Sequence, residues 1–163
     1  LTKRPARVLE FFVWYGQQSI RGTGIYAFFD PFGPGGLTKE SGIPRSIWLG
    51  VSVENQRTAD ERIPPLLEVP AAVRSVSVEP MLGPVDLSPW LPWLDWVICG
   101  GESGPNRRPF DVEWALDLYE QCRGAGVPYF GKQASGLRPG TPLELPRYGV
   151  VQEWPAVATM RTA

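Results

Sequence analysis

Four short runs rich in β-branched and aromatic residues recur along the chain. They lie at 47–54, 73–79, 94–99 and 127–131, and the first is apolar at nearly every position. Runs of this length and composition are typical of strands buried on both faces, as in parallel sheets. The pattern therefore predicts four strands that belong to one parallel sheet.

Helical patterns fall between these runs. Residues 55–62 are polar with helical character, and Pro64 and Pro65 are predicted to break or restart that helix because proline lacks the backbone N–H. The clearest helix follows Asp111, a good N-cap, and ends at Gly124 and Gly126. Its apolar stripe comprises Trp114, Ala115, Leu118, Tyr119 and Cys122.

The rest of the chain is less regular. Residues 5–15 predict a helix that begins at a proline, and residues 16–46 combine many glycines with aromatic side chains, which is typical of a loop insertion. The stretch 134–163 is rich in glycine and proline and predicts an irregular tail. We expect 1–163 to be one unit, a fragment of a (β/α) barrel.

A short sequence repeat suggests how the strands are arranged. Val-Ser-Val-Glu at 51–54 recurs at 76–79, and Glu102 and Lys132 also follow or end apolar strands. A repeat of about 25 residues fits a strand plus its crossover, and the handedness of such crossovers makes the strands parallel. The sequence therefore predicts an α/β fold, a partial parallel TIM-like barrel.

Charged residues mark the carboxyl ends of the predicted strands, where β/α barrels carry their active sites. We expect five of them to converge on one cavity: Lys3, Glu54, Glu79, Glu102 and Lys132. Clustered carboxylates would raise one pKa unless a cation neutralises them. The alternative is that each charge caps its own strand and faces water.

Such a mixture suits several kinds of chemistry. It could serve general acid–base catalysis, a Mg²⁺ site or the binding of a zwitterionic ligand. Lys3, Glu79, Glu102 and Lys132 are the candidate catalytic residues. Gly100 and Gly101 would let a ligand approach the backbone, although a tight turn explains them equally well.

Composition narrows the choice of chemistry. The chain has no histidine, which excludes Ser-His and Cys-His nucleophile systems within it. Its two cysteines, Cys99 and Cys122, lack metal-ligand spacing, so no metal site is expected from this chain alone. Unclustered thiols and the lack of a signal peptide favour the cytoplasm.

Charge and hydropathy bear on the partners. A net charge of −1 gives no support to nucleic acid as a partner, although it does not exclude one. No apolar stretch is long enough to span a bilayer, so no membrane is expected. A small-molecule cofactor is possible, and the edge of an incomplete barrel predicts self-association.

Several ordered motifs resemble an uncharacterised family of phage and prophage proteins, a domain of unknown function. The motifs lie at 1–5, 48–56, 59–64, 76–85, 95–104 and 132–133. Members of that family typically begin with three closely spaced cysteines, similar to the cluster loop of radical S-adenosylmethionine enzymes. The resemblance implies S-adenosylmethionine and a [4Fe-4S] cluster in a full-length member.

The resemblance also implies residue roles. Ser52, Glu54 and Glu79 would contact the ribose or amino-acid group of S-adenosylmethionine. Gly100 and Gly101 are counted with the cofactor-binding residues because they would let a ligand approach the backbone. Glu102 and Lys132 would lie on the substrate side. This chain lacks the three-cysteine segment, which suggests a fragment or a natural truncation.

Three functions remain open at this point. The first is part of a radical S-adenosylmethionine-like enzyme, the second a non-catalytic remnant that binds a ligand or partner, and the third a Mg-dependent hydrolase. Whether the chain is an enzyme is left open.

Overall fold

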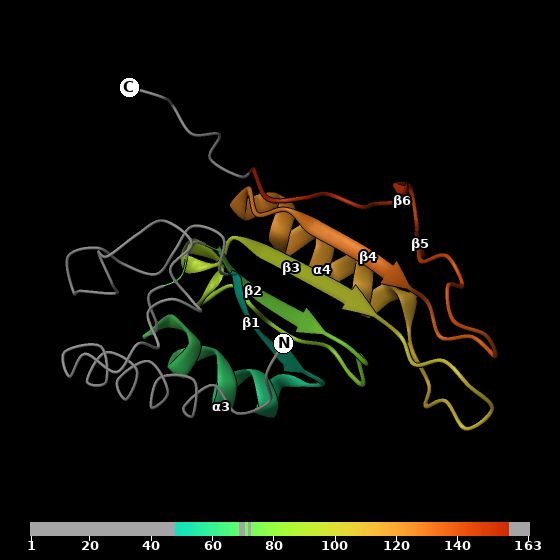
Figure 1. Cartoon of the computed structure of the whole chain (residues 1–163). Helices are drawn as coiled ribbons and strands as arrows, with labels where there is room; N and C mark the ends of the chain where they lie inside the picture. The colour runs from blue at the N-terminus through green and yellow to red at the C-terminus, as the bar shows by residue number, and fades with distance from the viewer. Residues whose placement is uncertain (1–47, 69–70, 72, 157–163) are drawn as a thin grey trace, which may run out of the picture.

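The computed structural model describes residues 48–68, 71 and 73–156, and strands alternate with helices along most of this part (Figure 1). Lys3, the predicted helix at 5–15 and the predicted insertion at 16–46 lie outside these residues. In chain order the elements are β1 Trp48–Val53, α3 Gln56–Leu67, β2 Val73–Val78, the 3₁₀ helix η1 Leu91–Trp93, β3 Trp96–Gly100, α4 Val112–Ala125, β4 Tyr129–Gln133, β5 Glu144–Leu145 and β6 Gly149–Val150.

Strands β1 to β4 form one parallel sheet in sequential order, as the sequence predicts. The described part of the sheet does not close into a barrel. The outer edge of β4 is covered instead by residues 151–153, which run antiparallel to it. Gly131 N donates to Val151 O at 2.8 Å, and Glu153 N donates to Tyr129 O at 2.8 Å. The tail also contains the two-residue strands β5 and β6, which pair antiparallel.

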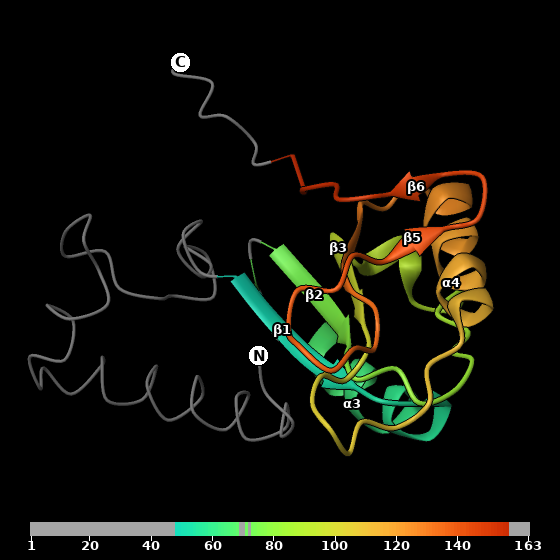
Figure 2. The same cartoon turned by 90° about the vertical axis from the view of Figure 1, so that its right-hand side faces the viewer.

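The two faces of the sheet differ in chemistry. The register aligns one row of side chains across the sheet, and these are Val51, Val76, Val97 and Tyr129. That row is buried against α3 and α4, which lie on the same side of the sheet (Figure 2). Because side chains alternate along a strand, Ser52 and Ser77 lie on the opposite face. Neither α3 nor α4 covers this opposite side of the sheet, and we call it the helix-free face.

Helix α3 continues through Pro64 and Pro65, so the predicted break at these residues is wrong. Each proline removes one intrahelical donor, and the carbonyls that lose it belong to Asp60 and Glu61. Both of these residues are exposed, so water can satisfy their carbonyls. Burial of the other side of the helix, which includes Ile63, holds it against the sheet.

The helix ends follow local hydrogen-bonding rules. Asn55 and Thr58 form a capping box at the start of α3, in which each side chain accepts a hydrogen bond from the other residue's backbone N–H. The predicted N-cap of α4, Asp111, accepts from Glu113 N at 3.0 Å. Helix α4 runs past Gly124 and ends at Gly126, whose φ of 71° is left-handed.

Substituting Asn55→Ala should lower the free energy of unfolding by about 1 kcal/mol, because a backbone donor of α3 loses its acceptor. Urea denaturation followed by circular dichroism measures this change. Asn106→Ala is the matched control, since Asn106 is exposed in a turn. Equal effects of the two substitutions would contradict the capping role.

Candidate functional site

The carboxyl ends of β1 to β4 bring charged side chains to one edge of the sheet. Glu54 directly follows β1, Glu79 directly follows β2 and Lys132 lies near the end of β4. Glu102 comes two residues after β3. Because the strands are parallel and paired in register, these four residues share the carboxyl edge. They form ion pairs at this edge instead of one cluster of carboxylates.

Glu79 and Lys132 form an ion pair across the sheet. Lys132 Nζ lies 2.9 Å from Glu79 Oε1 and 3.1 Å from Oε2. The pair joins β4 to the end of β2 and therefore passes β3, the strand between them. A Cβ on Gly100 of β3 would lie 3.3 Å from Glu79 Oε1. The absence of a side chain at Gly100 thus leaves room for the Glu79 carboxylate.

Glu54 is held by helix α3. Its Oε2 accepts from Arg62 Nη1 at 3.0 Å, and the same guanidinium nitrogen donates to Ser52 O at 2.6 Å. Both side chains are largely buried, with 13% of Glu54 and 18% of Arg62 exposed. Their pairing fixes the start of the β1–α3 connection to the helix. This contact gives Glu54 a structural role in addition to any role in binding.

Glu102 is paired within its own loop. Arg108 donates from Nε at 3.0 Å, from Nη2 at 2.9 Å and from its backbone N at 2.8 Å. The side-chain and backbone hydrogen bonds from Arg108 lower the pKa of Glu102 to about 2. Glu102 is therefore ionised at neutral pH. A bidentate guanidinium of this kind orients a carboxylate firmly.

Gly101 is approached by protein backbone. Its N donates to Gln133 O at 2.8 Å, and its O accepts from Gln133 Nε2 at 3.1 Å. A Cβ on Gly101 would overlap Ser135 N. The glycine therefore allows the segment after β4 to pack against the segment after β3. The chain itself makes this close approach, and the expected approach of a ligand to this glycine stays a prediction.

Sequence reasoning missed Ser77. This residue is fully buried in β2, pairs in register with Ser52 of β1, and its Oγ has no hydrogen-bond partner. The repeated Val-Ser-Val-Glu sequence held the signal. It contains a second serine at the position equivalent to Ser52, whereas only Ser52 and the two glutamates of the repeat were considered.

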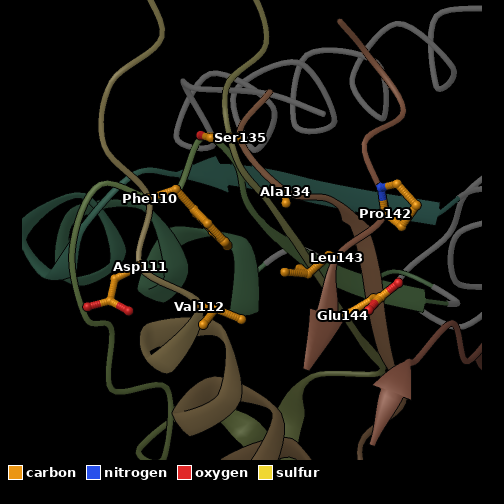
Figure 3. Close-up of a pocket in the computed structure, with 8 residues that line it drawn as sticks. All are labelled: Phe110, Asp111, Val112, Ala134, Ser135, Pro142, Leu143 and Glu144. Carbon is orange, nitrogen blue, oxygen red and sulfur yellow. The ribbon is translucent and has the colours of Figure 1, made fainter. Parts of the chain in front are cut away.

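A pocket of about 550 Å³ opens between the start of α4 and the segment after β4 (Figure 3). None of the candidate residues named from the sequence lines it. Its lining comprises Phe110, Asp111, Val112, Ala134, Ser135, Pro142, Leu143 and Glu144. Ser135 connects it to the carboxyl edge, because its Oγ accepts from Glu102 N at 3.1 Å.

The cysteines belong to the core. Cys99 and Cys122 are both buried, and burial raises the pKa of each thiol to about 12. Among the described residues, no three cysteine, histidine or acidic side chains are grouped closely enough to hold a metal ion. In the same ranges, no helix combines the length and apolar character needed to cross a bilayer.

Substituting Gly101→Ala should lower the free energy of unfolding by about 1–3 kcal/mol, because the new methyl group collides with backbone. Gly83→Ala is the matched control, since a Cβ there would meet nothing within 4 Å. Urea denaturation of both variants measures the difference. A Gly101→Ala variant as stable as Gly83→Ala would disprove the tight packing.

Removing the guanidinium in Arg108→Ala should raise the pKa of Glu102 from about 2 toward its ordinary 4.5. Because the pKa of Glu102 is lowered in the folded state, its ionised carboxylate stabilises the fold at pH values above about 4.5. This stabilisation is lost as the pH falls from about 4.5 to about 2. Carbon-detected NMR titration reports the midpoint directly. Arg107→Ala is the control and should leave the midpoint unchanged.

Comparison with known proteins gives the family. The sequence model of a family described as "Protein of unknown function (DUF5131)" matches residues 1–149. No curated protein matches the chain, and no solved structure matches it. Since the match spans far more than half of the chain, this protein belongs to the DUF5131 family of uncharacterised proteins.

Proposed function

We propose that this protein is part of a radical S-adenosylmethionine-like enzyme associated with phages or prophages, and that it binds S-adenosylmethionine at the carboxyl ends of β1 to β4. The observation that carries the proposal is the Glu79–Lys132 ion pair at this edge of a parallel sheet. The phage association and the radical type both follow from the sequence resemblance alone. The binding of S-adenosylmethionine can be tested on the chain itself.

The location suits a ligand. In parallel α/β sheets, ligands bind at the carboxyl ends of the strands. Glu79 and Lys132 offer one negative and one positive group there, with 19% and 52% of their side chains exposed. S-adenosylmethionine carries an ammonium and a carboxylate on one carbon, so each charge of the amino-acid group has an opposite partner in this pair.

The contacts narrow the roles expected from the sequence. Ser52 and Glu79 stay assigned to the cofactor. Lys132, expected on the substrate side, is reassigned to the cofactor because it pairs with Glu79. Glu54 is bound to Arg62 and Glu102 to Arg108, so these two carboxylates act first as structural anchors. Glu102 and its Arg108 partner are exposed enough to border a substrate as well.

An iron–sulfur cluster does not fit the residues of this chain. Radical enzymes of this kind use three closely spaced cysteines, whereas the sequence holds two, and both are buried in the core. The role proposed for the described residues is therefore limited to binding S-adenosylmethionine. The same observation favours a second candidate function, in which the chain binds its ligand without catalysis.

A Mg²⁺-dependent hydrolase receives less support. Mg²⁺ sites in proteins draw on carboxylate oxygens that face a common point. Each of Glu54, Glu79 and Glu102 has its own cation instead, namely Arg62, Lys132 and Arg108. These three neutralised carboxylates do not form a cation site.

Isothermal titration of the full chain with S-adenosylmethionine tests the proposal. Glu79→Gln and Lys132→Met should each weaken binding about tenfold, which corresponds to loss of one charged hydrogen bond of ~1.4 kcal/mol. The exposed pair Arg57–Glu61 supplies the controls, and Arg57→Met and Glu61→Gln should bind as the wild type does. A folded chain that does not bind S-adenosylmethionine would refute the proposal.

A further inference from the structure

The hydroxyl of Ser77 is the feature that the fold alone does not explain. Among buried side-chain nitrogen and oxygen atoms of the described residues, Ser77 Oγ is the one without a hydrogen-bond partner. A buried polar group without a partner costs stability, and proteins rarely keep one unless it serves another purpose. The residues on either side of it, Val76 and Val78, are buried and apolar, and they lie on the opposite face of the strand.

Ser75 provides an internal comparison. It lies on the same strand and the same face as Ser77, and only 7% of it is exposed. Its hydroxyl donates to Leu49 O at 3.3 Å. Two buried serines of one strand therefore differ in one respect: Ser75 is satisfied within the fold and Ser77 is not.

Ser77 faces the same side of the sheet as the ion pair. Side chains alternate along β2, so Glu79, two residues further on, continues the face that carries Ser77. Ser52 is the register partner of Ser77 on β1. Lys132 reaches Glu79 beside Gly100, which keeps this part of β3 free of side chain. Two hydroxyls and two opposite charges thus gather on the helix-free face, next to the carboxyl edge.

We propose that Ser77, together with Glu79 and Lys132, forms a receptor for the α-amino-acid group of a ligand. The ligand ammonium binds Glu79, and the ligand carboxylate binds Lys132 and accepts a hydrogen bond from Ser77. This assignment rests on the proposed function and deepens it, because it names the part of S-adenosylmethionine that the site recognises.

The proposed binding mode requires the Glu79–Lys132 ion pair to open. The Ser77 side chain has no exposed surface, so a ligand reaches it only by displacing the side chains that cover this face. Half of the Lys132 side chain is exposed, and a flexible lysine can swing away at little cost. The ligand then replaces the internal ion pair with one new partner for each charge and gives Ser77 the acceptor that it lacks.

A pair of alanine variants tests this proposal through stability. Ser77→Ala should raise the melting temperature by about 2–4 °C, because an unpaired buried hydroxyl is removed. Ser75→Ala is the matched control and should lower the melting temperature, because it removes the hydrogen bond from the Ser75 hydroxyl to Leu49 O. Calorimetry of the two full-length variants provides this readout without a ligand. A Ser77→Ala variant less stable than the wild type would show that Ser77 has a partner, and would overturn the proposal.

Binding provides the second readout. The probes are S-adenosylhomocysteine, which carries the amino-acid group, and 5′-methylthioadenosine, which lacks it. Ser77→Ala should weaken S-adenosylhomocysteine binding about fivefold to tenfold and leave 5′-methylthioadenosine binding unchanged. Equal affinity of wild type and Ser77→Ala for S-adenosylhomocysteine would overturn the receptor and leave the proposed function standing. A wild-type chain that binds neither probe would overturn the proposed function itself.

Discussion

The in-register parallel pairing of β1 to β4 decides where every candidate residue lies. Hydrogen bonds between adjacent strands bring the four carboxyl ends to one edge, and side-chain alternation then assigns each residue to a face. Glu79 meets Lys132 although 53 positions separate them in the chain. A slip of one residue between β1 and β2 would turn Ser77 into the layer that contacts the helices and would separate it from Ser52.

Much of this arrangement could be predicted from the sequence. The apolar runs predicted all four strands because strands buried on both faces need apolar residues, and the Asp111 and Gly126 signals predicted both ends of α4. The prolines of α3 misled because the carbonyls that lose a donor belong to the exposed Asp60 and Glu61, while Ile63 on the other side of the helix is buried against the sheet. Local rules describe what one segment prefers, and tertiary packing can outweigh that preference.

The pairing of the charges could not be predicted. The repeated Val-Ser-Val-Glu sequence and the regular spacing of the charges placed the glutamates at strand ends. The cation that pairs with each glutamate depends on which segments the folded chain brings next to it. Glu102 takes Arg108 from its own loop and Glu54 takes Arg62 from the next helix, whereas Glu79 crosses the sheet. Ser77 was missed for a related reason. Whether a buried hydroxyl has a hydrogen-bond partner depends on all the atoms around it, and these come from several parts of the chain. Lys3 lies outside the described residues, so its predicted place at this edge stays a prediction.

The antiparallel segment 151–153 pairs with the outer edge of β4, so the two edges of the parallel sheet differ in whether another strand can be added. Where this segment pairs with Tyr129 and Gly131, it occupies the backbone groups that a fifth parallel strand would need. One flank of the sheet is thus terminated by the chain's own carboxyl-terminal region. Among the described residues β1 pairs with β2 alone, so any additional parallel strand, whether from this polypeptide or from another, would have its place beside β1.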